Sequence, residues 1–243
     1  MTFGYNMLHN TNVDQQEITK FAALAEQWWD PEGEFKPLHD INPLRLSFIQ
    51  QHCQLTGKKI LDVGCGGGIL AESMARCGGH VTGIDMAENV LQAAKIHAEK
   101  EHLNIEYVCT TIESLADKQN AYYDVITCME LLEHVPDPNS IVAACSRLIK
   151  PQGALFFSTI NRNFKSYLHA IIGAEYLLKL LPKGTHHYEK FIRPSELSRW
   201  LQGNNLQMQK LMGISYNPLT KHYYLNSNDV DVNYLVFCQQ TIE

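Results

Sequence analysis

The stretch KKILDVGCGGGILAESMARCGGHVTGID, residues 58–85, decides the fold. It begins with a short apolar run, KKILDVG, that is typical of a buried strand. ILAESMARC, residues 69–77, is typical of a helix that ends at Gly78 and Gly79, and HVTGID, residues 80–85, predicts a second strand. This order of strand, helix and strand predicts two parallel strands joined by a crossover helix.

The same alternation continues along the chain. We expect helices over 87–100 and 138–149, and strands over 104–109, 123–129 and 153–160. This pattern predicts an α/β fold with a doubly wound, mostly parallel sheet that is covered by helices on both faces. Two further strand-like runs, near 206–216 and 232–241, are close enough in the chain to pair as an antiparallel hairpin.

The length of 243 residues suits a single domain of this kind with additions. At the N-terminus we expect a helix over 15–30, a Pro- and Gly-rich loop over 30–43 and a helix from 44 to 54. We therefore divide residues 1–243 into an N-terminal helical cap (15–54), a ligand-binding core (58–160), an insert (162–193), and a C-terminal helix with strands (194–243).

Composition excludes several classes of protein. The net charge of −6 argues against a nucleic-acid-binding protein, which normally has a basic surplus. No run reaches the roughly 18 uninterrupted apolar residues of a membrane-spanning helix, and the N-terminus has no basic start followed by an apolar segment. The seven cysteines include no C-x-x-C pair, which predicts reduced thiols in a cytosolic protein.

The glycine-rich turn between the first strand and the first helix predicts a ligand site. Gly64 and Gly66 let the backbone approach a ligand closely, and the helix that follows supplies free N–H groups. NAD-linked oxidoreductases use a similar turn to bind a dinucleotide, so the glycines alone do not identify the ligand. Asp62 precedes Gly64 by two residues and favours a cationic cofactor that carries an amino acid, because a carboxylate repels a pyrophosphate.

Two later positions extend this site. Asp85 ends the second strand, where a carboxylate accepts hydrogen bonds from both hydroxyls of a ribose, or else caps the next helix. Met86 follows it and is assigned to the same site. After the third strand, Ile112 is suited to cover the face of an adenine, with Thr111 or Glu113 at its edge; a local helix cap is the alternative.

These features resemble the class I S-adenosylmethionine-dependent methyltransferases. The likeness covers about 58–160 and rests on the glycine loop, Asp85 and YDVITCMELLEHVPDP, residues 123–138. The resemblance implies a seven-stranded doubly wound sheet whose last strand is antiparallel. It also implies that S-adenosylmethionine is the methyl donor and that Met129 lines its pocket.

Over about 13–235 the chain resembles one family within that class, the ubiquinone-biosynthesis O-methyltransferases. The likeness rests on WWDPEGEFKPLHDINPLR, MELLEHVPDP, STINRN, GAEYLLKLLPKGTH and VDVNY. It implies methyl transfer to ring hydroxyls of polyprenylated catechol and demethylquinol intermediates, at both O-methylation steps of ubiquinone biosynthesis. It further implies other enzymes of that pathway as partners, and contact of Arg45 with the cofactor's carboxylate. Without the resemblance, we would place Arg45 on a solvent-exposed face of its helix.

The sequence ELLEH, residues 130–134, follows the fourth strand at the end of the sheet where such folds bind ligands. A phenol with a pKa of about 10 is mostly protonated at neutral pH, so transfer to its oxygen needs a base or a cation. In one interpretation Glu130, Glu133 and His134 hold a magnesium-type ion, and the two carboxylates converge if the turn is helical. In the other, His134 is the general base and Glu133 orients it.

The insert over 162–193 combines a basic net charge with many apolar side chains. It carries six Lys or Arg residues against two Glu, and one narrow sector of a helical wheel holds Lys165, His169, Glu175, Lys179 and Lys183. This pattern predicts either a helix packed over the active-site mouth or an interfacial helix on an anionic membrane. Because the acceptor implied by the resemblance has a polyprenyl tail, we expect a cytoplasmic protein bound peripherally to the inner face of the cytoplasmic membrane.

Two other functions fit parts of the pattern. A methyltransferase acting on another membrane lipid or quinone, at carbon or nitrogen, would share the fold but would not need a cation that grips a catechol. A non-catalytic member of the fold would bind only a cofactor or partners, and the intact ELLEH beside an intact glycine loop argues against it.

Overall fold

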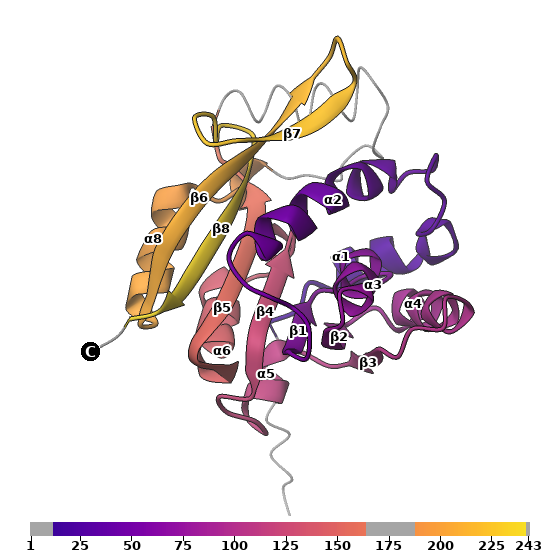
Figure 1. The fold of residues 1–243 in the computed structure, drawn as a ribbon, viewed down its shortest axis with the longest axis horizontal. Helices are drawn as coiled ribbons and strands as arrows, with labels where there is room; N and C mark the ends of the chain where they lie inside the picture. Colours follow the sequence, from indigo (N-terminus) through magenta and orange to yellow (C-terminus); the bar gives the residue numbers. More distant parts are fainter. Residues whose placement is uncertain (1–11, 164–187, 242–243) are drawn as a thin grey trace, which may run out of the picture.

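The computed structural model describes residues 12–163 and 188–241 and is built on one eight-stranded sheet (Figure 1). The strand order across the sheet is β3-β2-β1-β4-β5-β8-β6-β7. The strands are β1 (Lys59–Val63), β2 (His80–Asp85), β3 (Glu106–Cys109), β4 (Tyr123–Met129), β5 (Ile149–Ile160), β6 (Leu206–Asn217), β7 (His222–Asn226) and β8 (Asn233–Gln240).

Strands β1 to β5 are parallel, whereas β8 pairs antiparallel with both β5 and β6. This arrangement confirms the predicted fold class, and all seven predicted strands are present. The eighth strand is β7, which pairs antiparallel with β6 at the edge of the sheet. The last two predicted strands, β6 and β8, are antiparallel neighbours as expected, but the tight hairpin is formed by β6 and β7.

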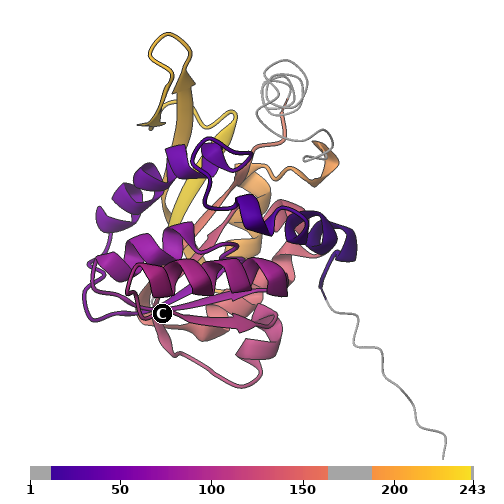
Figure 2. The same ribbon diagram turned by 90° about the vertical axis from the view of Figure 1, so that its right-hand side faces the viewer.

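Helices cover both faces of the sheet (Figure 2). One face packs against α5 (Ile112–Ala116), α6 (Pro138–Leu148) and α8 (Pro194–Gly203). The other packs against α3 (Ile69–Arg76) and α4 (Glu88–Lys100), together with α2 (Lys36–Gln50) from the N-terminal region. The strands between them, such as β4, are buried along nearly their whole length, as expected for parallel strands covered on both sides.

The N-terminal region differs in detail from the prediction. Helix α1 (Gln15–Ala22) and the short 3-10 helix η1 (Ala25–Gln27) replace the single helix expected over 15–30. The loop predicted over 30–43 was wrong in its second half, because α2 begins at Lys36 and continues through Pro43. Proline removes one helical hydrogen bond, but α2 buries a face that includes Phe48 and Ile49, and this packing keeps the helix continuous.

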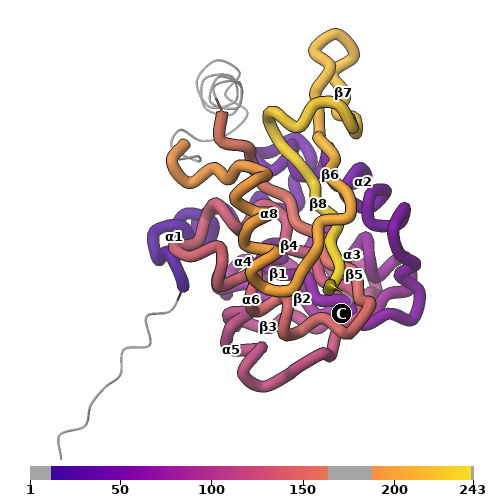
Figure 3. The backbone as a smooth tube through the Cα atoms, turned by 90° about the vertical axis from the view of Figure 1, so that its left-hand side faces the viewer, coloured from indigo at the N-terminus to yellow at the C-terminus, as the bar shows by residue number. Residues whose placement is uncertain are grey.

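The helix predicted within the insert lies largely in 164–187, outside the described residues. The two ends of the insert are described and meet beside β8 (Figure 3). Arg162 donates to the carbonyl of Glu189 over 3.1 Å and forms an ion pair with Glu196, and the Tyr234 hydroxyl donates to the carbonyl of Ile192 over 2.9 Å. Within 12–163 and 188–241, no helix has both the length and the apolar character needed to cross a membrane.

Candidate active site

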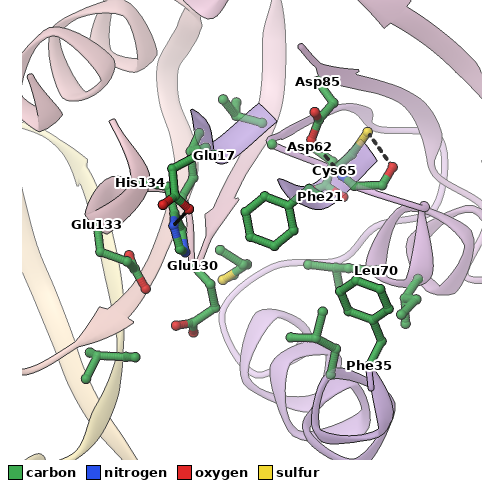
Figure 4. A pocket seen from close by; sticks show the side chains of 18 of the residues that line it. Glu17, Phe21, Phe35, Asp62, Cys65, Leu70, Asp85, Glu130, Glu133 and His134 are labelled. Carbon is green, nitrogen blue, oxygen red and sulfur yellow. Dashed lines mark hydrogen bonds and ion pairs between the residues drawn. The ribbon is translucent and has the colours of Figure 1, made fainter. Parts of the chain in front are cut away.

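A cavity of about 1040 Å³ opens at the carboxyl ends of the parallel strands (Figure 4). It lies between the sheet, the N-terminal helices and the β6–β7 hairpin. Every residue that the sequence assigned to a site lines this cavity, namely Arg45, Asp62, Gly64, Gly66, Asp85, Met86, Ile112, Met129, Glu130, Glu133 and His134. The cofactor residues and the acidic residues predicted for catalysis therefore face one common space.

The glycine loop is packed directly beneath the N-terminal region. Gly64 and Gly66 have positive φ angles of 67° and 53°, which glycine adopts without strain. A Cβ at Gly66 or Gly67 would collide with the ring of Trp28, and the Trp29 indole N–H donates to the carbonyl of Gly67 over 2.9 Å. The glycines thus permit close approach of the tryptophans as well as of a ligand.

Asp85 does not cap α4, whose N-cap is Ala87 without a side-chain hydrogen bond, but both of its carboxylate oxygens accept from backbone N–H groups. Its Oδ1 accepts from the backbone N–H of Ala87 over 2.9 Å, and its Oδ2 accepts from that of Gly66 over 3.0 Å. Burial raises the pKa of Asp85, and these backbone donors oppose the shift. The carboxylate therefore ties the end of β2 to the glycine loop, and Asp85 lines the cavity.

Asp62 lies at the floor of the cavity at the end of β1. The Thr127 hydroxyl donates to its Oδ1 over 2.7 Å, and the residue is only 3% exposed. Burial raises the pKa of Asp62 to about 7, although the hydrogen bond from Thr127 opposes the shift. A nearby cationic ligand would restore its charge, which fits the predicted preference for a cofactor that carries positive charge.

Of the residues that follow β3, some make local contacts at the start of α5 and others line the cavity. Thr111 caps α5, because its hydroxyl accepts from the N–H of Ser114 over 3.2 Å. Glu113 accepts hydrogen bonds from Asn12 and Ser140. The local-cap alternative is therefore present in the structure for Thr111, while Ile112 is buried and lines the cavity.

Arg45 reaches the site from α2 and pairs with Glu130. Its guanidinium lies 3.1 Å from Glu130 Oε1, which also accepts from the Ser158 hydroxyl over 2.7 Å and from the Asn233 amide over 3.1 Å. Burial favours the neutral form of Glu130, but the Arg45 charge and these donors hold its pKa below the ordinary value. Arg45 Nε has no hydrogen-bond partner, so the guanidinium retains a donor for a further ligand.

Glu133 is buried beside Glu130. Burial and the negative charge of Glu130 raise the pKa of Glu133 well above its ordinary value, despite a hydrogen bond of 2.7 Å from the Thr159 hydroxyl to Oε2. The turn between the two residues is not α-helical, since Glu130 has a positive φ of 52° and only Leu132–His134 form a 3-10 turn. The two carboxyl groups nevertheless converge, and burial beside Glu130 favours the neutral form of Glu133.

His134 is oriented by a residue that the sequence did not identify. Its Nδ1 lies 2.8 Å from Oε2 of Glu17, in α1, and the hydrogen bond to His134 lowers the pKa of Glu17. The alternative in which Glu133 orients His134 is therefore not the arrangement found. Glu17 is 9% exposed and lies one turn before Phe21, so an acidic residue on the apolar side of α1 was the signal that sequence reasoning missed.

The predicted metal set is only partly assembled. Among the described residues, no group of three or more His, Cys, Asp and Glu side chains is placed to hold a metal ion. His134 is turned toward Glu17 (Figure 4). The two carboxyl groups do fit a hard cation, because Glu133 Oε1 and the neighbouring Asn233 Oδ1 are buried oxygens without a hydrogen-bond partner.

Comparisons with known proteins identify the fold. The methyltransferase domain family matches residues 38–211. Magnesium protoporphyrin IX methyltransferase from Synechocystis, solved with S-adenosylmethionine bound, is 14% identical with a TM-score of 0.64, and the match covers 96% of this chain and 100% of that one. At this identity the likeness concerns the fold alone.

Sequence relatives identify the family. Ubiquinone biosynthesis O-methyltransferases from Acinetobacter baylyi and Saccharophagus degradans are 62% and 57% identical to this chain. The first match covers 93% of this chain and 95% of its relative, and the second covers 94% and 97%. The chain therefore belongs to the S-adenosylmethionine-dependent methyltransferases, within the family of ubiquinone biosynthesis O-methyltransferases.

Proposed function

We propose that the enzyme methylates ring hydroxyls of polyprenylated catechol and demethylquinol intermediates, at both O-methylation steps of ubiquinone biosynthesis. The observation that carries this proposal is the convergence of Arg45, Glu130 and Glu133 in the same cavity as the glycine loop and Asp85. Methyl transfer is an in-line displacement at a sulfonium, so acceptor oxygen and methyl group must be aligned in one enclosed site. A cavity of about 1040 Å³ has room for both ligands.

S-adenosylmethionine is bound by Arg45, Asp62, Gly64, Gly66, Asp85, Met86, Ile112 and Met129 in this proposal. Asp85 receives the ribose hydroxyls, and Ile112 covers the adenine. The free donor of Arg45 meets the carboxylate of the methionine part, while Asp62 faces its positive charge. Bound in this way, S-adenosylmethionine would supply a methyl group in the same cavity as Glu130 and Glu133, at the end of β4.

The proton of the acceptor hydroxyl goes to His134 in one form of the mechanism. Because Glu17 is ionised, His134 Nδ1 donates to it and Nε2 is left as the proton acceptor. Glu17 is then a positioning residue, which fixes the imidazole tautomer and its direction. The acceptor oxygen, once deprotonated, attacks the methyl carbon while the C–S bond breaks.

The second form of the mechanism uses the predicted cation site of Glu130, Glu133 and His134. Glu130 and Glu133 would hold a magnesium-type ion through carboxylate oxygens, and His134 would join them after leaving Glu17. Such an ion supplies positive charge that lowers the pKa of a catechol hydroxyl. Support comes from the buried oxygens of Glu133 and Asn233 that lack partners.

We further propose a cytoplasmic location, peripheral at the inner face of the cytoplasmic membrane, with the basic insert over 162–193 as the contact with anionic lipid. The surplus of Lys and Arg in this segment and the hydrophobic tail of the acceptor support the proposal. Other enzymes of the ubiquinone pathway are the expected protein partners.

Methyl transfer from S-adenosylmethionine to a catechol with one isoprene unit, measured with and without a chelator, tests the function. Activity that is lost with the chelator and restored by magnesium supports the cation site. Activity that does not respond to the chelator leaves His134 as the general base. If the enzyme binds the cofactor but transfers no methyl group to oxygen, the proposal fails, and lipid acceptors that react at carbon or nitrogen become the alternative.

A further inference from the structure

The active-site cavity extends beyond Glu130 into a slot between α2 and the β6–β7 hairpin. The wall formed by α2 includes Leu38 and Ile41, and its inner end is Arg45. Residues four and seven positions apart lie on one side of a helix, so these three side chains form a continuous line. The line runs from the ion pair of Arg45 and Glu130 outward toward the start of the helix.

The opposite wall is formed by the β6–β7 hairpin, from which Ile214, Ser215, Tyr216, Tyr223 and Tyr224 line the cavity. Tyr216 pairs with Tyr223 across the two strands, and Ile214 pairs with Leu225. Residues directly opposite each other project from the same face of a sheet, and the two tyrosine rings are 4.9 Å apart. Figure 1 shows this hairpin rising beyond the rest of the sheet, beside α2.

The two walls differ chemically from the inner end of the cavity. Beyond Arg45, the cavity-lining residues that α2 and the hairpin contribute are uncharged in the described part of the chain: Pro37, Leu38, Ile41, Ile214, Ser215, Tyr216, Pro218, Tyr223 and Tyr224. Tyr216 and Tyr224 are each 45% exposed, so aromatic surface remains open to a ligand at the outer end. None of these side chains carries a charge, so a charged group would lose hydration there without gaining a counter-charge from the two walls, whereas a hydrocarbon gains free energy when it leaves water.

We propose that this slot binds the isoprenoid chain of the acceptor, with the ring held at Glu130 and Glu133. The inference rests on the proposed function, because it takes the acceptor to be a prenylated catechol. It assigns an orientation: the hydroxyls face the acidic end, and the first isoprene units leave along α2 toward Tyr216. The chain then contributes to substrate recognition as well as to membrane retention.

The test compares kcat/KM for a catechol that carries one or two isoprene units with kcat/KM for the unprenylated catechol. We expect the wild-type enzyme to favour the prenylated acceptor, and we expect Tyr216→Ser and Leu38→Gln each to reduce that preference about tenfold. Tyr122→Ser is the matched control, because Tyr122 is a similarly exposed tyrosine, 41% exposed, just before β4 and outside the cavity lining.

The outcomes separate this inference from the proposed function. If the wild-type enzyme methylates both acceptors with equal kcat/KM, or if both slot variants keep the wild-type preference, the slot does not bind the chain. If it methylates neither catechol, the proposed function fails and the assignment of the slot fails with it. Because Tyr216 is substantially exposed, its variant is expected to fold, and the melting temperature verifies this.

Discussion

Asp85 and Gly66, which meet at the cofactor end of the cavity, are 19 positions apart in the chain, whereas Glu17 and His134, which meet at the acceptor end, are 117 positions apart. The pair of Arg45 and Glu130 spans 85 positions, and that of Glu130 and Asn233 spans 103. The glycine loop and Asp85 at the cofactor end thus lie within one strand, helix and strand unit, which Arg45, Ile112 and Met129 join from other elements. The acceptor end is assembled from α1, α2, β4 and β8, which only the complete fold brings together.

This difference implies that the two ends of the cavity depend differently on the rest of the molecule. Backbone groups of the glycine loop form much of the cofactor end, and the sheet holds them in place. At the acceptor end, buried polar and charged side chains from different helices and strands pair with one another, as Arg45 does with Glu130. Removing one member of such a pair leaves the charge of the other buried without a partner. Substitutions that leave one partner behind should therefore be most costly at the acceptor end.

Removing the positive charge of Arg45, which lies between the two ends of the cavity, should have the largest effect on stability. Arg45→Met leaves Glu130 buried without its 3.1 Å partner, and we expect the free energy of unfolding to fall by about 3–5 kcal/mol. The double variant Arg45→Met/Glu130→Gln should recover part of this loss, as measured by urea unfolding. Lys36→Met, also on α2, removes an exposed ion pair with Asp40 and should leave the free energy of unfolding nearly unchanged, because solvent screens such a pair. Equal losses in the two single variants would contradict the expected difference.

The contrast between the two ends also explains what the sequence could predict. The glycine loop, Asp85 and the order of the parallel strands follow from local patterns, since a turn between a strand and a helix constrains nearby residues directly. Glu17 could not be assigned a partner, because nothing near it in the chain specifies His134. The helix through Pro43 was missed because proline is locally unfavourable, and only packing of Phe48 against the sheet outweighs that preference.

Glu130 and Glu133 lie side by side without the helical turn on which the argument from sequence depended. A helical turn would have placed them on one side, but Glu130 has a left-handed backbone. Donors from β5 hold both carboxyl groups in place instead: Ser158 binds Glu130, and Thr159 binds Glu133. These donors lie in the STINRN motif, which sequence comparison singled out without revealing its contacts.

At the cofactor end, we expect a smaller effect that depends on pH. The pKa of Asp62 is about 7 in the folded protein and 3.8 ordinarily, so the folded state retains a proton that the unfolded chain releases. Stability of the cofactor-free enzyme should therefore decrease as pH rises from about 4 to about 7. Asp62→Asn should remove this loss, which makes the variant more stable than wild type by roughly 2–4 kcal/mol above pH 7.

Unfolding by urea at several pH values measures this difference. The control is Asp124→Asn: burial raises the pKa of Asp124, but the hydrogen bonds from Lys150 and from the Lys59 backbone, with the lysine charges, together lower it. The stability that Asp124 provides is present above its ordinary pKa and is lost as pH falls. The difference in free energy of unfolding between Asp124→Asn and wild type should therefore change with pH in the opposite direction. A curve for Asp62→Asn that is flat, or that parallels the control, would show that Asp62 stays ionised in the folded protein.

The smallest expected effect concerns the orientation of His134 at the acceptor end. Glu17→Gln keeps the size of the side chain but removes the charge that favours the N–H at Nδ1, so we expect kcat to fall about tenfold. KM for S-adenosylmethionine should not change, because Glu17 lies at the other end of the cavity, and Glu17→Asp should recover part of the rate. Glu26→Gln, an exposed change in the same N-terminal region, is the control. A loss that appears equally in kcat and in KM for the cofactor would mean that Glu17 only holds α1 in place. A selective loss in kcat would show that a residue outside the matched methyltransferase domain takes part in the chemistry at the end of β4.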